Sequence, residues 1–180
     1  MTANECIKGR RSIRQFTDKP VAREVLTDIV ETASYAPSWK NTQIVRYIAV
    51  EGALKDRIAS ECTSAYARNG EIIRNAPLLI AVTFIKNRSG FERDGSFSTP
   101  KEGGWQMFDT GIAAEAFCLA AYEHGLGSVI LGIFDEAKAS ALLSLPEDRE
   151  LAALVPIGYP AEAPAAPKRK PVEDLLSYLS

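Results

Sequence analysis

The sequence predicts an α+β fold built on one domain. Its 180 residues are close to the usual size of a single domain, and a composition of 46% hydrophobic and 24% charged residues is enough to bury a sizeable core. Segments with helical and with strand character are interleaved along the chain, without internal repeats or low-complexity tracts. This interleaving indicates helices and strands that share one core.

The first half of the chain predicts two helices and two strands. Arg23 to Tyr35 places apolar residues at helical spacing and stops before Pro37, whose ring disfavours a longer helix. Val45 to Val50 has strand composition, and Gly52 to Arg68 after it has the character of a single helix. Leu78 to Ile85 is a nearly continuous apolar run, which is typical of a strand buried on both faces. We therefore expect this run in the centre of a sheet.

The second half predicts a surface loop, a long buried helix and three shorter elements. Asn87 to Gly104 collects Gly, Ser, Asp, Lys and Pro, so we expect a lid or a substrate loop there. Trp105 to His124 carries few charges on any side, which indicates either a core helix or a subunit interface. Ser128 to Leu131 and Leu151 to Ile157 are expected strands, and Glu136 to Leu143 is an expected short helix.

The end of the chain predicts an extended arm. Tyr159 to Pro171 is rich in Pro and Ala, a composition that favours an extended backbone over a packed element. Val172 to Leu179 is expected to close the chain as a short amphipathic helix. Such an arm is suited to reaching another molecule.

Charge and cysteine usage exclude several classes of function. A formal net charge of −2 gives no general field that attracts nucleic acid or an anionic membrane. The apolar runs are too short to cross a bilayer and Met1 to Arg11 lacks the core of a secretory signal, so we expect a cytoplasmic protein without membrane contact. Cys6, Cys62, Cys118 and the single His124 support neither a disulfide framework, a metal site nor a nucleophilic triad. The chemistry is therefore expected to belong to a bound cofactor.

Three arginines and a serine form the first candidate site. Arg10, Arg11, Ser12 and Arg14 lie close together near the start of the chain. Guanidinium groups bind phosphate through paired donors and a hydroxyl adds a neutral donor, with each charge-assisted bond contributing about 1.5–3 kcal/mol. The cluster has the composition of an anion site. A solvated basic surface turn is the alternative, and the spacing alone leaves both open.

The turn after the first predicted helix is the second candidate site. Pro37, Ser38 and Asn41 belong to the segment APSWKNTQ at 36–43, whose amide and hydroxyl groups are able to read the edge of a heterocycle. Alternatively, Ser38 caps a following turn and Asn41 forms a local Asx turn, with no ligand involved.

Two later segments complete the candidate set. Lys168, Arg169 and Lys170 lie between prolines in the arm, where an extended backbone would project Lys168 and Lys170 to one side and suit them to a dianion. Adjacent cations are otherwise simply solvated. In the glycine-bounded segment 125–132, Leu131 and Gly132 end a strand, and a glycine there permits close approach of the backbone to a flat ligand.

Taken in order, these segments resemble the nitroreductase family of FMN-dependent oxidoreductases over almost the whole chain. The opening RRSIRQF at 10–16 looks like the family signature RRSxRxF, and APSWKNTQ looks like its APSxxNxQ turn. The stretch from GWQMFDTG to GSVILGIF at 104–134 is similar to its central helix and flavin-contacting strand, and IGYPAEAPAAPKRKPVEDLL at 157–176 to its GYPxE and basic-Pro tail. Glu115 departs from the pattern, because many members carry Gln there.

The resemblance implies a fold and an assembly. The expected fold is a three-layer α+β sandwich in which a central, mostly antiparallel sheet is flanked by helices. Two chains are expected to form an intertwined homodimer with one FMN at each of two sites built from both subunits. Residues 1–180 would form one domain, with the arm 159–180 wrapping the partner subunit and Trp105 to His124 serving as the dimer helix.

The resemblance also implies roles for the phosphate-binding residues. Arg10 and Ser12 would hold the FMN phosphate, and the tail Lys168 to Lys170 would complete the cage. Arg11 is expected to contribute mainly its backbone. The cradle would therefore join the two ends of the chain.

The flavin ring has its own implied contacts. Arg14 would lie beside N1 and O2, where its permanent charge stabilises the reduced ring. Pro37, Ser38 and Asn41 would come from the partner subunit, and Leu131–Gly132 would offer backbone amides near N5.

The implied function is two-electron transfer by a ping-pong mechanism. NADH or NADPH would reduce tightly bound FMN, and a nitroaromatic, quinone or similar small aromatic acceptor would then take its place; neither a catalytic side chain nor a metal is expected. The alternatives are other flavin chemistry on the same fold, by a dehydrogenase, dehalogenase or flavin-fragmenting enzyme, and a non-enzymatic flavin-binding or redox-sensing module. A nucleic-acid site is disfavoured because no aromatic residues interleave with the cations.

Overall fold

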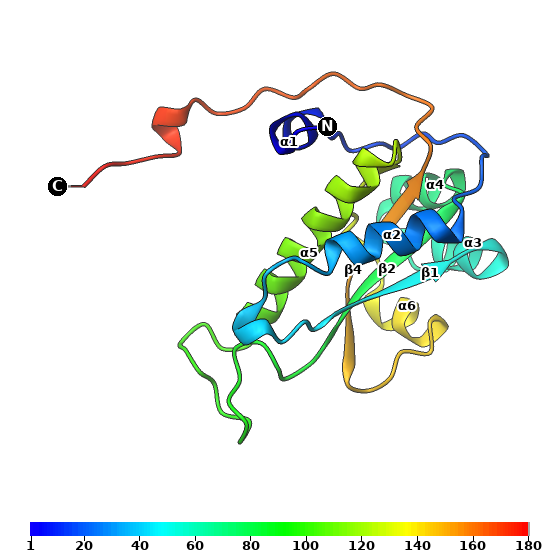
Figure 1. Cartoon of the computed structure of the whole chain (residues 1–180). Coiled ribbons are helices and arrows are strands. Elements are labelled where there is room, and N and C mark those ends of the chain that lie inside the picture. The colour runs from blue at the N-terminus through cyan, green and yellow to red at the C-terminus, as the bar shows by residue number, and fades with distance from the viewer. Residues whose placement is uncertain (180) are drawn as a thin grey trace.

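A four-stranded antiparallel sheet forms the middle layer of the structure, a computed structural model that describes residues 1–179 (Figure 1). The strands are β1 (Val45–Val50), β2 (Leu78–Ile85), β3 (Gly127–Ser128) and β4 (Arg149–Gly158). They lie in the order β1-β2-β4-β3, and every neighbouring pair is antiparallel. The apolar run of β2 is buried almost throughout because it pairs on both sides and is covered on both faces.

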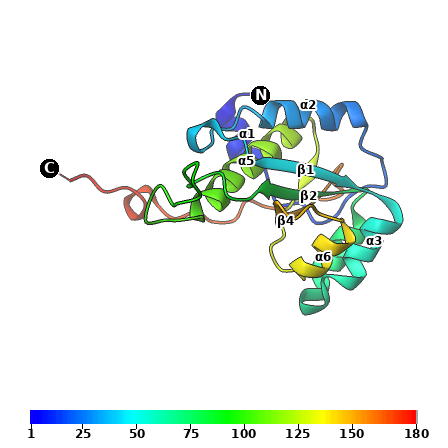
Figure 2. The ribbon, with the colours of Figure 1, turned by 90° about the horizontal axis from the view of Figure 1, so that it is seen from below.

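Helices cover the two faces of this sheet (Figure 2). The bounds are α2 (Arg23–Ala33) and α5 (Gly104–Glu123) on one face, and α3 (Gly52–Glu61), α4 (Ala67–Asn75) and α6 (Glu136–Leu142) on the other. The short α1 (Ala3–Gly9) lies beside α5. The three layers confirm the α+β sandwich with an antiparallel sheet.

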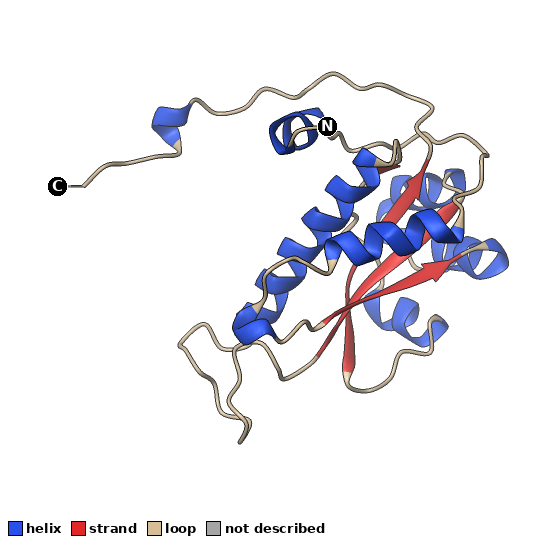
Figure 3. Ribbon diagram, viewed as in Figure 1, coloured by secondary structure: helices blue, strands red, loops and turns tan. Residues whose placement is uncertain are grey.

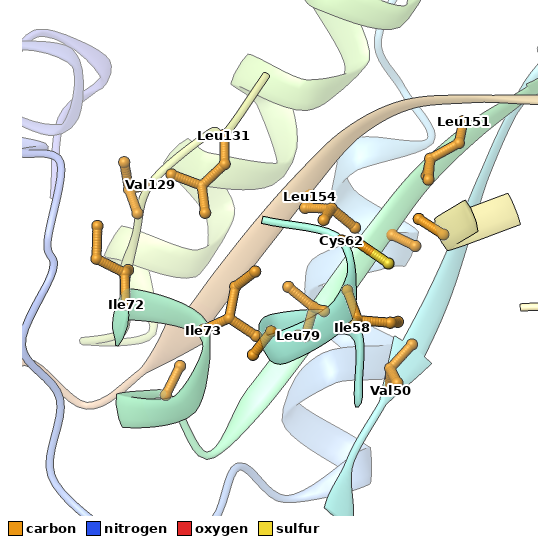
Figure 4. Close-up of a cluster of buried hydrophobic side chains, with 14 of the residues drawn as sticks. Val50, Ile58, Cys62, Ile72, Ile73, Leu79, Val129, Leu131, Leu151 and Leu154 are labelled. Carbon is orange, nitrogen blue, oxygen red and sulfur yellow. The ribbon is translucent and has the colours of Figure 1, made fainter. Parts of the chain in front are cut away.

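Alternate residues of β2 supply the two halves of the core. Leu79 and Ala81 belong to the apolar cluster under α3, α4 and α6, which Figure 4 shows in close-up. Leu78, Ile80 and Val82 belong to the cluster under α2 and α5. Successive side chains of a strand point to opposite faces, so one apolar strand anchors both helical layers.

Most predicted elements are confirmed, but the helix expected over 52–68 is wrong. The chain forms α3, a 3-10 turn at Ser64–Tyr66 and then α4. Thr63 donates its hydroxyl to the Ala59 carbonyl at 2.7 Å, and a Cβ at Gly70 would lie within 2.5 Å of the Thr63 hydroxyl. Because α3 ends at Glu61, shortly before this threonine, α4 turns back and packs closely on α3.

The helix α1 was not among the predicted elements, although its signal is present. Thr2 and Glu5 form a capping box, in which the Glu5 amide donates to Thr2 Oγ1 at 3.2 Å and the Thr2 amide donates to Glu5 Oε2 at 2.8 Å. The same contacts lower the pKa of Glu5. The T-x-x-E spacing is the known sign of such a helix start.

The last two segments also differ in part from expectation. The strand expected over Ser128 to Leu131 is shorter, because Leu131 meets β4 only through an isolated bridge to Leu154. The arm after Gly158 is extended, as expected, and runs away from the body (Figure 3). The terminal helix is wrong: only the single 3-10 turn Val172–Asp174 forms, because a short helix without packing partners is not stable in water.

Candidate functional site

A basic pocket of about 300 Å³, which we call the cradle, lies between the first segment (residues 10–14) and the arm (residues 164–169). Its lining includes Arg10, Arg11, Ser12 and Arg14 from the first segment, and Arg169 from the arm. The two segments run together because the Ala161 amide donates to Gln15 O at 2.9 Å and the Thr17 amide donates to Tyr159 O at 2.9 Å. Backbone bonds thus hold four guanidinium groups around one hollow.

The first segment is fixed to the sheet edge by a close backbone approach. The Ile13 amide donates to Ser128 O at 3.0 Å, and Ser12 forms a parallel bridge with Ser128. A Cβ on Gly127 would lie 2.6 Å from Ile13 Cγ1. Glycine at this position therefore lets the cradle segment lie flat against β3.

A carboxylate of the arm holds the backbone of Arg14. Glu162 Oε1 accepts from the Arg14 amide at 2.6 Å and from the Gln15 amide at 3.3 Å, and Arg14 Nη1 donates to Ser12 O at 3.1 Å. The sequence placed Glu162 in the GYPxE motif but did not predict this contact. The feature that could have indicated it is that Glu162 is the one charged residue in the stretch 159–167.

Arg10 and Ser12 offer donors that the rest of the chain does not use. Arg10 Nε is buried and makes no hydrogen bond within residues 1–179; Glu115 Oε1 lies 3.5 Å away but outside hydrogen-bond geometry. The Ser12 hydroxyl has no hydrogen bond to the described residues either. Buried donors are normally matched, so the Arg10 nitrogen points to an anionic ligand, and the hydroxyl of the half-buried Ser12 is free to contact the same ligand. The donor set fits a phosphate group.

Arg11 differs from its neighbours in the cradle. Its Nη1 donates to the Lys8 carbonyl at 2.7 Å and to the Arg10 carbonyl at 2.8 Å. The side chain thus closes the end of α1, where unpaired carbonyls favour a cation. These contacts are structural in kind, and the expected contribution of the Arg11 backbone to the cofactor site stays a prediction.

The arm places its cations differently from the pattern expected from an extended backbone. Arg169 lines the cradle and donates through Nη1 to Pro167 O at 3.1 Å, whereas Lys168 and Lys170 lie outside the lining. Within this chain the side that faces the pocket is therefore that of Arg169, and not that of Lys168 and Lys170 as alternation along an extended backbone predicted. The arm contributes a guanidinium, which suits phosphate better than an ammonium group does.

Of the two amides expected to face N5, one is already in use. The Leu131 amide donates to Leu154 O at 2.8 Å, and the Leu154 amide donates back to Leu131 O at 3.1 Å. The role expected for Leu131 is wrong in this respect, because the bridge to β4 occupies its donor. The Gly132 amide makes no hydrogen bond within residues 1–179, and its residue is exposed.

The turn that follows α2 lies at the other end of α5 from the base of the cradle. Gly9 packs on the Tyr122 ring near the helix end, whereas the Trp39 amide donates to Asp109 Oδ2 near its start, at 2.9 Å. At 1.5 Å per residue the two contacts are about 20 Å apart along the axis. Within one chain, Pro37, Ser38 and Asn41 are therefore not brought to the cradle.

This turn has an unusual backbone. Lys40, Asn41 and Gln43 have φ values of 46°, 56° and 48°, in the left-handed region that disfavours side chains with a Cβ. Ser38 Oγ accepts from the Gln43 amide at 3.0 Å, and Gln43 Nε2 donates to Asn41 Oδ1 at 3.2 Å. Such conformations persist only where surrounding contacts impose them, and they cluster at functional sites.

The cysteines and the histidine lie outside the cradle lining. Burial raises the pKa of the Cys6, Cys62 and Cys118 thiols, which favours their protonated form. His124 Nε2 lies 3.0 Å from Asp28 Oδ2, away from the cradle. No group of His, Cys, Asp or Glu suited to a metal occurs among residues 1–179. The same stretch has no helix with the length and apolarity to span a membrane.

Comparison with known proteins assigns the family. The model of the nitroreductase family matches residues 7–71 and 64–159. FMN reductase [NAD(P)H] of Bacillus subtilis is 34% identical over 94% of this chain and 72% of its own. The iodotyrosine deiodinase of Daphnia pulex is 28% identical over 93% of this chain and 62% of its own. The structure of an FMN-dependent nitroreductase from Clostridium difficile superposes with a TM-score of 0.74 at 28% identity, covering 92% of this chain and 91% of the other. The chain belongs to the nitroreductase family.

Proposed function

We propose that the protein is an FMN-dependent oxidoreductase that transfers two electrons from NADH or NADPH to a nitroaromatic, a quinone or a similar small aromatic acceptor. The observation that carries this proposal is the cradle, where the buried Arg10 Nε, 3.5 Å from Glu115 Oε1, and the Ser12 hydroxyl make no hydrogen bond within residues 1–179 and lie beside Arg14 and Arg169. The relatives whose names include FMN and NAD(P)H support the same cofactor and donor.

The residues of the cradle would bind the cofactor from its phosphate end. Arg10, Ser12 and Arg169 supply charged and neutral donors for the phosphate oxygens. Arg14, whose backbone is held by Glu162, would place a permanent positive charge beside the ring. Gly132 offers a free amide and no side chain, which permits close contact with a flat group.

Bound FMN supplies the exchange of two electrons between the nicotinamide donor and the acceptor. The chain would contribute binding, orientation and electrostatic stabilisation. Because one open face of the ring is expected to receive both reactants in turn, ping-pong kinetics follow. A side-chain acid or nucleophile is not needed for this role.

A homodimer would complete the site. The outer face of α5 exposes Met107 (51%) and Phe108 (59%), with Gly111 and Glu115 further along the same face. Large exposed apolar side chains on one helix face favour a protein interface. Two α5 helices packed antiparallel about a two-fold axis would bring the turn of one chain toward the cradle of the other, which a single chain does not do.

The arm is proposed to wrap the partner subunit. Leu175 and Leu176 are exposed in the isolated chain. A hollow of about 390 Å³ between α2 and β1, with Leu26, Val30 and Tyr47 in its lining, offers an apolar surface beside the turn. The partner's arm would cover this hollow. Sedimentation at micromolar concentration tests the assembly: a folded, flavin-loaded monomer would overturn both the dimer and the wrapped arm.

The deiodinase match favours reductive dehalogenation as the second candidate function. It would use the same cofactor site with a halogenated phenol as acceptor. The two candidates are separated by offering flavin-loaded protein and NADPH a quinone, a nitroaromatic and an iodinated phenol in parallel, and measuring iodide release in the last.

The decisive experiment is the visible absorption spectrum of the purified protein, followed by titration with each nicotinamide without oxygen. A flavin spectrum that bleaches with NADH or NADPH and recovers with menadione supports the proposed reaction. A colourless protein that takes up no FMN in calorimetry overturns it. A yellow protein that neither nicotinamide reduces supports the binding or redox-sensing module instead.

A further inference from the structure

A buried carboxylate joins the turn, the long loop and α5. Asp109 is 3% exposed, and its Oδ2 accepts from the Trp39 amide at 2.9 Å and from the Ser89 hydroxyl at 2.6 Å. Ser89 is fully buried, and its oxygen lies 2.7 Å from Thr42 Oγ1. Figure 1 shows these segments converging at the start of α5, with the turn in cyan and the loop in green.

Two outer contacts tie the same segments together. Lys40 Nζ lies 3.0 Å from Glu92 Oε1, which joins the turn to the loop. The rings of Trp39 and Trp105 meet with centroids 4.7 Å apart. The turn and the loop therefore form one unit around Asp109, which we call the turn–loop unit (residues 38–43 and 87–105).

The Asp109 carboxyl group forms no salt bridge among residues 1–179. Burying a carboxyl group is unfavourable, and here hydrogen bonds from the Trp39 amide and the Ser89 hydroxyl offset that cost. The Asp109 oxygen holds the turn at Trp39, directly before the positive-φ residues Lys40 and Asn41. An apolar residue would fill the space but leave the Trp39 amide unmatched and the Ser89 hydroxyl with Thr42 Oγ1 as its one remaining partner among residues 1–179.

We propose that Asp109 is a positioning residue for the flavin site of the partner subunit. It fixes the turn–loop unit so that Pro37, Ser38 and Asn41 are held in the one conformation that fits the ring. This inference rests on the proposed function, because it needs FMN bound between two chains. Asp109 acts through the Trp39 amide and through Ser89, and it does not touch the ligand.

The test compares Asp109→Ala, Asp109→Asn and Thr110→Val in the full-length protein. Asn keeps an oxygen that accepts both hydrogen bonds, whereas Ala removes it. Thr110 is the matched control because it is equally buried on the same helix, but its hydroxyl donates only to Gln106 O of that helix, at 2.7 Å. Each variant is measured for FMN dissociation constant, visible circular dichroism of bound FMN, kcat and KM with menadione, and melting temperature.

We expect Asp109→Ala to raise the FMN dissociation constant about tenfold and to lower kcat/KM by a similar factor, with an altered flavin dichroism band. Asp109→Asn should restore most of each property, and Thr110→Val should leave all three unchanged. A lower melting temperature alone, with wild-type flavin affinity and dichroism in Asp109→Ala, overturns the inference.

If Asp109→Ala does not fold, Ser89→Ala takes its place, since it removes one of the two donors and leaves the Trp39 contact. An intermediate loss of flavin affinity and a changed dichroism band are then expected, and wild-type values in both overturn the inference. Wild-type protein that binds no FMN overturns the proposed function itself. If the wild-type protein is active and the variants keep its FMN affinity and flavin dichroism, only the role of Asp109 is rejected.

Discussion

The cradle and the turn–loop unit each depend on a carboxylate that accepts from the backbone, but they differ in the donors that they leave free. In the cradle, Glu162 and main-chain bonds fix the backbone, while Arg10 Nε and the Ser12 hydroxyl make no hydrogen bond within residues 1–179. In the turn–loop unit, a buried side chain fixes a strained backbone; the Trp39 amide and the Ser89 hydroxyl are matched, whereas the Trp39 indole nitrogen makes no hydrogen bond within residues 1–179. The cradle thus offers cationic donors to a ligand, whereas the turn–loop unit presents a fixed backbone. The following predictions test this contrast, from the largest expected effect to the smallest.

Arg10→Ala should cause the greatest loss. Removing a charge-assisted contact of about 1.5–3 kcal/mol should weaken FMN binding by about tenfold to a hundredfold. Fluorescence quenching of FMN titrated into the flavin-free protein measures the change. Arg57→Ala is the matched control, because Arg57 lies on α3 and pairs with Glu61 at 2.9 Å. Equal affinity in the two variants would show that the free donor of Arg10 is not for the phosphate.

Glu162→Ala should have the next largest effect. It leaves the amides of Arg14 and Gln15 without their acceptor, so the cradle backbone loosens and FMN affinity should fall about tenfold. Glu162→Gln keeps an oxygen and should recover most of the affinity. Isothermal titration calorimetry gives both values. If the two variants behave alike, the charge of Glu162 matters more than its hydrogen bonds, and the cradle is not positioned as described.

Arg14→Ala should lower the two-electron potential of bound FMN. A fixed cation beside the ring stabilises the negative charge of the reduced state, and losing about 1.4 kcal/mol corresponds to about 30 mV. Equilibration with a reference dye during slow reduction measures the shift. A potential that stays constant or rises would contradict the placement of Arg14 beside the pyrimidine end.

The smallest expected effect concerns the outer link of the turn–loop unit. Hydrogen bonds from Ser98 and Lys40 lower the pKa of Glu92 below its ordinary 4.5. Stability from this link should be complete above pH 4.5 and disappear as the pH falls through the lower folded value. Amide exchange in residues 90–98, corrected for intrinsic rates, should thus be constant from pH 7 to pH 5 and faster below pH 4.5. Glu92→Gln should abolish that dependence. Because the pair is exposed, the change should be small.

The same contrast explains how much the sequence could predict. Arg10, Ser12 and Arg14 stand close together in the chain, so the sequence offered an anion site as an alternative to a solvated turn, and the family resemblance favoured the anion site. The contacts of Asp109 with Trp39 and Ser89 join residues far apart in sequence, and no local pattern shows them. The antiparallel sheet followed from the resemblance, whereas the break at Thr63 and the bridge of Leu131 depend on tertiary packing. In the arm, the alternation of side chains along an extended backbone predicted that Lys168 and Lys170 face the ligand. The structure instead places Arg169 in the cradle lining, with its Nη1 donating to Pro167 O.

The pairing of the first segment with the arm has a consequence for folding. Arg14 and Glu162 are 148 positions apart in the chain, so the cradle closes only after the sheet between them has folded. Loss of the arm from residue 162 onward would therefore leave the sheet and both helical layers in place, but it would remove Glu162 and Arg169 from the cradle.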